Sequence, residues 1–148
     1  MELVFTKGNG KYDRMDVIRG DGVRESVDCP KQRIIPHDMV HFAVESVLCN
    51  RGFLRRVHEG EPANFRMAPD AETDAVERLV EVFQGDGWSG GNSPPDDMLD
   101  LYRVTCEARA CPVLPIDASD IHAVRARIEE LTAQWNAVDV GGTLRLAF

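Results

Sequence analysis

The sequence predicts an α+β fold, in which a small antiparallel sheet is covered by three to four helices. Two hairpin-turn dipeptides separate short apolar runs in the first 30 residues. Apolar residues then recur at helical spacing through the middle of the chain, and the last six residues alternate again. At 148 residues the chain is long enough to bury a core, so we expect one domain over residues 1–148.

The N-terminal segment is expected to form a three-stranded meander. Asn9-Gly10 and Asp21-Gly22 tolerate positive φ, so these two dipeptides are expected to join the strands. In the second strand the alternation places Met15 and Val17 on one face. Residues 143–148 also alternate, and we expect this last strand to return to an edge of the same sheet.

Apolar periodicity predicts the covering helices. They are expected over residues 36–48, over 71–84, from 94 to the prolines at 112 and 115, and from about 117 to 140, with a short additional helix over 53–58. Pro36 suits the start of a helix, and Gly85-Asp86-Gly87 is expected to close the helix over 71–84. In the helix that follows Pro94, Leu101 is expected on the buried side.

The last predicted helix carries an apolar seam with heptad spacing. Its members alternate at intervals of three and four: Ile121, Val124, Ile128, Leu131, Trp135 and Val138. Such a seam could be the interface of a homodimer or of a complex with a protein partner. We favour packing within the chain, because a small meander needs a covering helix.

Charge and composition exclude several classes of partner. Residues 1–60 carry a net charge of +1, whereas residues 61–148 carry −9. This acidic second half argues against nucleic acid and against an anionic membrane, since both require a basic surface. No apolar run approaches the ~20 residues of a membrane span, and the opening does not resemble a signal peptide, so we expect a cytoplasmic protein.

The run from Pro36 to Glu45 is the most chemically specific feature of the chain. His37, His41 and Glu45 lie four residues apart, so they share one ridge of a helix. Two imidazoles and a carboxylate could bind a divalent metal such as zinc, and His58 is a candidate for a further ligand. The alternative is a structural role, in which the histidines pack or bond to the backbone or to Glu45. The helical wheel places Glu45 on the polar side.

Other motifs favour structural interpretations. Residues 85–90 match G-x-G-x-x-G, but a helix precedes them where a nucleotide-binding loop requires a strand. Arg51, Arg55, Arg56 and His58 could hold an anion, but a solvated face paired with acidic residues is more typical. The four cysteines contain no C-x-x-C pair and are expected to be reduced thiols.

Two classes of function remain open. The first is a small non-catalytic binding or interaction domain that works through its acidic helical half. The alternative is a divalent-metal-binding protein or metal-dependent hydrolase centred on His37 and His41, for which zinc is one candidate cofactor. The sequence indicates neither a substrate nor a catalytic residue, and the metal content of the purified protein separates the two classes.

Overall fold

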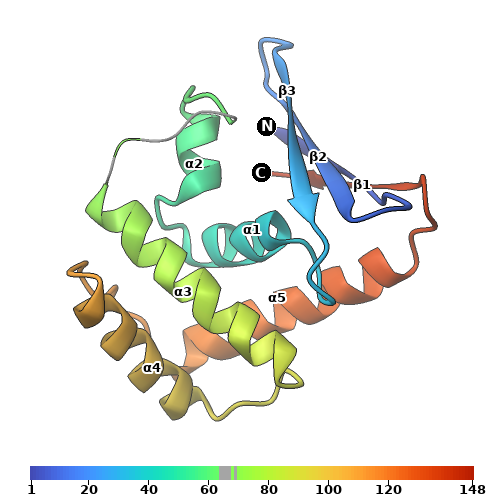
Figure 1. Cartoon of the computed structure of the whole chain (residues 1–148). Coiled ribbons are helices and arrows are strands. Elements are labelled where there is room, and N and C mark those ends of the chain that lie inside the picture. Colours follow the sequence, from blue (N-terminus) through green and yellow to red (C-terminus); the bar gives the residue numbers. More distant parts are fainter. Residues whose placement is uncertain (64–67, 69) are drawn as a thin grey trace.

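A computed structural model describes residues 1–63, 68 and 70–148, and it has the α+β architecture that the sequence predicts (Figure 1). The strands are β1 Glu2–Thr6, β2 Tyr12–Ile18, β3 Arg24–Pro30 and β4 Thr143–Ala147. The helices are α1 His37–Leu48, α2 Phe53–His58, α3 Ala71–Trp88, α4 Pro95–Ala108 and α5 Ala118–Asn136. Among the described residues, no helix has the length and apolar character needed to cross a membrane.

The four strands form one antiparallel sheet in the order β3-β2-β1-β4. Asp21-Gly22 forms the predicted turn between β2 and β3, where Gly22 has a φ of 85°, which glycine adopts without strain. Asn9-Gly10 lies in the connection from β1 to β2, but neither residue has positive φ and residues 7–11 form a longer loop than the predicted tight turn. Phe5 of β1 pairs with Met15 on one side and with Leu144 on the other. The closing strand therefore completes the sheet at an edge, and the chain ends lie together: the Phe148 amide donates to the Met1 carbonyl at 2.9 Å.

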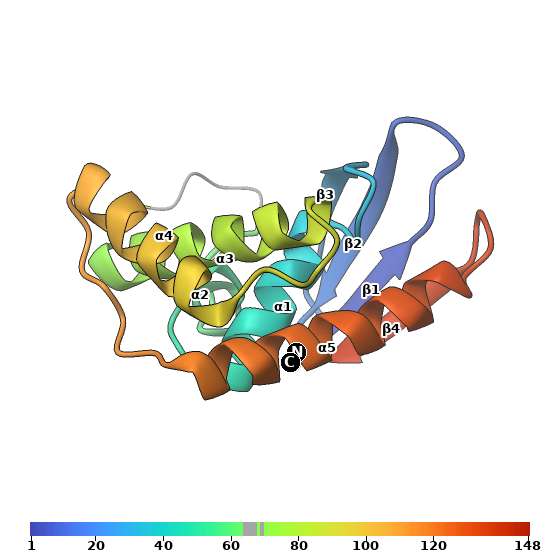
Figure 2. The same ribbon diagram turned by 90° about the horizontal axis from the view of Figure 1, so that it is seen from below.

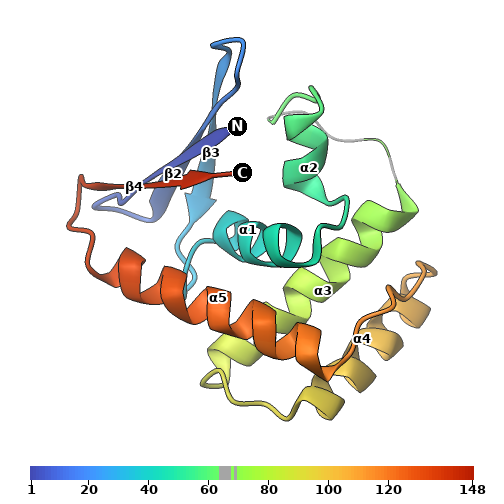
Figure 3. The same cartoon turned by 180° about the vertical axis from the view of Figure 1, so that it is seen from behind.

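All the helices lie on one side of the sheet (Figure 2). Leu3, Phe5, Met15 and Val17 point toward them and are fully buried. Helix α1 is at the centre of the helical layer, where it packs against α2, α3 and α5 and touches β3 (Figure 3). This arrangement encloses most of the surface of α1, including the ridge that carries the polar side chains of His41 and Glu45.

The apolar seam of α5 packs within the chain, as we favoured. Ile121, Val124 and Leu131 are fully buried, and the ring of Trp135 meets the ring of Phe5 edge to face at 6.5 Å. Helix α5 lies along α1 and covers the β1 side of the core. These side chains therefore belong to the hydrophobic core of the chain itself.

Three details of the helices differ from the sequence predictions. Helix α5 ends at Asn136 rather than near residue 140, so Val138 of the predicted seam follows the helix. Helix α3 continues to Trp88 rather than ending before Gly85, because Gly85 and Gly87 take helical angles and positive φ first occurs at Gly90 and Gly91. Leu101 is 53% exposed instead of buried. The buried face of α4 is formed by Met98, Leu99, Tyr102 and Cys106, which turns Leu101 toward solvent.

Candidate metal centre

The predicted histidine ridge lies where α1 crosses α3. Helix α1 begins directly after Pro36, so His37 is in its first turn and His41 is one turn further on. Glu77 is in the middle of α3 and reaches both histidines from the opposite side. The crossing thus brings two imidazoles and one carboxylate together from segments 36 residues apart, counted from His41 to Glu77.

The ligand atoms of these three residues face one another. His41 Nε2 lies 3.1 Å from His37 Nε2 and 2.8 Å from Glu77 Oε2. His37 Nε2 lies 3.4 Å from the other oxygen of Glu77, Oε1. Each residue offers one atom to a cluster that fits within 4.8 Å. Within the described part of the chain, this is the one group of at least three histidine, cysteine, aspartate or glutamate side chains with such spacing.

These separations match those between ligands of a single metal ion. Two atoms that each lie about 2.05 Å from zinc are about 2.9 Å apart at a right angle and about 3.4 Å apart at the tetrahedral angle. The separations between His37, His41 and Glu77 run from 2.8 to 3.4 Å when each histidine is measured to its nearer Glu77 oxygen, and with a single oxygen chosen the three ligand atoms lie within 4.8 Å of one another. A metal ion could therefore bind between these side chains with little movement of the two helices.

Glu45 orients His41 from behind. His41 Nδ1 lies 3.0 Å from Glu45 Oε1, and the carboxylate also accepts the amide hydrogens of Leu54 and Arg55 at 3.1 and 2.8 Å. As an acceptor with these donors, Glu45 fixes the proton of His41 on Nδ1 and leaves Nε2 directed at the cluster. Carboxylate, imidazole and metal in this order are the usual outer support of a metal site.

The helical wheel wrongly placed Glu45 on the polar side of α1. Glu45 is fully buried and His41 is 2% exposed. The first turn of α2 covers this ridge and donates two amides to it, and Val76 of α3 packs close by. Sequence periodicity describes one helix at a time, so it could not include the elements that bury this side.

The two helices also determine the charge state of the cluster without a metal. Burial alone would lower the pKa of His41, but Glu45 and Glu77 outweigh it and raise that pKa to about 10. Burial would likewise raise the pKa of Glu77, but His37 and His41 outweigh it and hold this pKa well below its usual range. At neutral pH the metal-free cluster is therefore an imidazolium between two carboxylates, and a metal would replace the proton on Nε2.

The cluster is accessible from solvent on one side. A pocket of about 340 Å³ opens beside it, and His37 and Glu77 are each about one-third exposed at its edge. Phe53, Thr73 and Asp74 line the rest of the pocket. Asp38 also reaches the pocket, but its carboxylate accepts the thiol of Cys29 at 3.3 Å.

Comparisons with known proteins offer no independent guide to this site. Neither the protein-family models, nor the curated proteins, nor the solved structures searched give a match to this chain.

The sequence-predicted ligands are only partly brought together. His37 and His41 are in the cluster, Glu45 supports it from outside, and His58 lies elsewhere, with its ring 6.2 Å from that of Phe148. Glu77 was not among the predicted ligands. Its only sequence signal is a carboxylate between Val76 and Arg78 on a predicted helix, which is typical of a solvated position.

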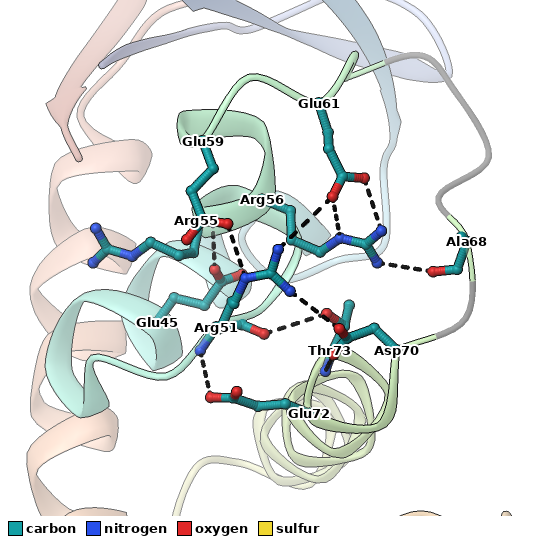
Figure 4. A network of polar contacts seen from close by, with 10 residues as sticks. All are labelled: Glu45, Arg51, Arg55, Arg56, Glu59, Glu61, Ala68, Asp70, Glu72 and Thr73. Carbon is teal, nitrogen blue, oxygen red and sulfur yellow. Dashed lines mark hydrogen bonds and ion pairs between the residues drawn. The ribbon is translucent and has the colours of Figure 1, made fainter.

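The basic residues after α1 form a structural network instead of an open anion site (Figure 4). Arg51 pairs with Glu59 at 2.8 Å and with Asp70 at 3.1 Å. Arg56 is almost fully buried and pairs with Glu61 through two hydrogen bonds of 2.7 and 2.8 Å. These contacts hold α2 against the start of α3, and so keep the α2 amides in place under Glu45.

The glycine motif and the cysteines lie apart from the cluster. Residues 85–88 of the G-x-G-x-x-G match form the last turn of α3, where the helix dipole is negative and does not favour phosphate. All four cysteines are free thiols, with Cys29 and Cys106 buried. Within the described residues, no sulfur contributes to the histidine–glutamate cluster.

Proposed function

We propose that the protein binds one divalent transition-metal ion, zinc by preference, through His37 Nε2, His41 Nε2 and one oxygen of Glu77. The observation that carries this proposal is the close approach of the three side chains: His41 Nε2 lies 3.1 Å from His37 Nε2 and 2.8 Å from Glu77 Oε2, and one ligand atom from each residue fits within 4.8 Å. Nitrogen and oxygen sites bind zinc more tightly than manganese or iron(II), which is the reason for the preference.

Charge supports a cation at this position. Glu45 is fully buried and Glu77 is two-thirds buried, and the histidines between them are neutral when they bind a metal. One divalent ion would then balance both carboxylates. Buried carboxylates are costly unless a cation or hydrogen-bond donors compensate them, so a metal ion would stabilise the crossing of α1 and α3.

The open side of the cluster favours catalysis over a purely structural role for the metal. Three protein ligands leave a position for water, as in catalytic zinc sites, whereas structural zinc has four protein ligands. Zinc lowers the pKa of bound water to about 7, so the reaction class that we infer is hydrolysis. Phe53, Thr73 and Asp74 are the side chains placed to contact a substrate in the adjoining pocket.

Thermal unfolding of the tag-free protein with and without zinc tests the proposal. Zinc at about 100 times its Kd should stabilise the fold by about 2.7 kcal/mol, because it binds only the native state. For a chain of this size, that corresponds to an increase in Tm of about 5–10 °C. The increase should disappear in His41→Ala and remain in His122→Ala, since His122 is exposed on α5.

The His41→Ala variant leaves Glu45 buried without one of its donors, so it could fail to fold. His37→Ala and Glu77→Gln change the two ligands that are partly exposed, so these variants test the proposal even if His41→Ala does not fold. Both should reduce the zinc-dependent increase in Tm, whereas Glu107→Gln on the exposed side of α4 should not. An increase that survives in His37→Ala and Glu77→Gln would refute the proposed ligands. The hypothesis of a non-catalytic interaction domain predicts no response to zinc in any of these proteins.

A further inference from the structure

A second pocket, separate from the histidine–glutamate cluster, is larger than the pocket of about 340 Å³ beside that cluster. Its volume is about 620 Å³, within the range of small-molecule sites. It lies between α5, the end of α3 and the loop that precedes α1, and it shares no lining residue with the pocket beside the metal ligands. Any ligand bound here would therefore act independently of the proposed metal.

The inner wall of this pocket is apolar. Ile35, Val40, Phe83 and Trp135 line it, and all four side chains are at least nine-tenths buried. Ile128, the seam residue of α5 that remains partly exposed, continues the apolar wall toward the opening. The four wall residues expose almost no surface themselves, so a ligand with an aromatic or aliphatic body would cover mainly the exposed part of Ile128.

The pocket also gathers positive charge in an acidic protein. Lys7, Arg33 and Arg125 line it, against the carboxylates of Asp86 and Glu129. Asp86 is neutralised, since Arg125 pairs with it at 3.2 Å and the Ser93 amide donates to it at 2.9 Å. The lining is therefore net positive, although the whole chain carries a net charge of −8.

Arg33 is the cation that is free to bind a ligand. Lys7 donates to the Trp135 carbonyl at 2.6 Å, and Arg125 is held by Asp86 and by the Ser93 carbonyl. Arg33 is exposed and forms no ion pair with any residue that the structure describes. Its backbone is left-handed, with a φ of 71°, a conformation that side chains other than glycine, asparagine and aspartate adopt rarely and at a cost.

We propose that this pocket binds a small organic anion with an apolar body, whose acidic group pairs with Arg33 and whose body packs against the partly exposed side chains of Ile34 and Ile128. The chemical class is an aryl or alkyl carboxylate, sulfonate or similar monoanion. Charge complementarity selects the acidic group, and the apolar wall selects the body.

Anilinonaphthalene sulfonate has both features and serves as the probe. We expect it to bind the wild-type protein with a stoichiometry of one, as measured by fluorescence and isothermal titration calorimetry. N-phenylnaphthylamine is the same ring system without the sulfonate. It should bind at least about tenfold more weakly, because it cannot form the charge-assisted hydrogen bond to Arg33.

Two pairs of variants locate the probe. Ala133→Phe fills the pocket from the exposed face of α5 and should abolish binding, whereas Ala126→Phe, on the same helix outside the pocket, should not. Arg33→Gln should weaken binding of the sulfonate about tenfold and leave binding of the neutral analogue unchanged, whereas Arg109→Gln should alter neither. Circular dichroism confirms the fold of each variant.

The proposal fails if the sulfonate binds Ala133→Phe as it binds the wild type. It also fails if Arg33→Gln has no effect, or if N-phenylnaphthylamine binds as tightly as the sulfonate. If Ala133→Phe does not fold, Arg33→Gln and the neutral analogue still decide the outcome, because neither changes the core.

Discussion

Glu45 shows how one residue connects the candidate metal centre to the fold. Its carboxylate accepts three hydrogen bonds, from the His41 imidazole and from the amides of Leu54 and Arg55. It therefore orients His41, the proposed metal ligand, and satisfies two amides in the first turn of α2 at the same time. Loss of its position should affect metal affinity and stability together.

Gly52 provides a test of this dual role that leaves Glu45 itself unchanged. A Cβ at Gly52 would lie 2.5 Å from Glu45 Cδ and 2.6 Å from Val76 Cγ1, so a shift is required. We expect Gly52→Ala to lower the free energy of unfolding by about 1–3 kcal/mol, the cost of overpacking. It should also weaken zinc binding about 10-fold or more, because His41 loses its support. Urea unfolding and zinc titration measure the two effects.

Gly85→Ala is the matched control. Gly85 lies within α3 and a Cβ there would meet nothing within 4 Å. Alanine is better than glycine in a helix by about 1 kcal/mol, so this variant should be slightly more stable and should bind zinc normally. Normal zinc binding by Gly52→Ala would show that Glu45 does not position His41.

The environment of Asp16 predicts that the stability of the protein depends on pH, independently of the metal. Burial alone would raise its pKa, but the hydrogen bonds of Ser26 and Arg24 outweigh it and lower that pKa. Because the pKa of Asp16 is lower in the folded state, its ionised carboxylate stabilises the protein at pH values above about 3.9, the ordinary pKa of an aspartate. This stabilisation is lost as the pH falls through the pKa of Asp16 in the folded state. Asp16→Asn should therefore be less stable than the wild type at pH 7, and the difference in urea midpoint should shrink below about pH 4. A difference that is constant with pH would contradict this. Asp28→Asn, exposed on β3, is the control.

At the scale of elements, periodicity predicted which segments form helices and strands, and packing determined which faces they bury. The α5 seam was predictable because its apolar residues recur over five turns. Helix α4 was predicted as well, but its buried face was partly wrong, because Leu99 and Leu101 are both apolar and only the neighbouring helices select Leu99 for the core. The end of α3 was missed for a related reason, since glycine can both continue a helix and end it.

Leu131→Asp tests the assignment of the seam to the core. Leu131 is fully buried on α5, so an aspartate there would be a charge without a partner, and the free energy of unfolding should fall by about 4 kcal/mol or more. Ala126→Asp, at an exposed position of the same helix, should cost much less. Urea unfolding of both proteins measures the difference. Equal midpoints would show that the seam faces solvent or another chain.

At the scale of the whole molecule, the candidate centre depends on the crossing of α1 and α3. The sequence alone could indicate His37 and His41, because their spacing is a property of one helix. It could not indicate Glu77, because only tertiary packing brings that carboxylate to within 2.8 Å of His41. The same packing excludes His58, which α2 directs toward Phe148. Local patterns thus predict ligands on one element, and the fold selects their partners.

X-ray absorption spectroscopy of the zinc-loaded, tag-free protein identifies the atoms bound to the metal. We expect one zinc per chain, surrounded by nitrogen and oxygen at about 2.0–2.1 Å, with the outer-shell scattering of two imidazoles. Glu77→Gln should reduce the zinc content, and Glu107→Gln should not. Sulfur at about 2.3 Å would place the metal on the cysteines and contradict the assignment to His37, His41 and Glu77.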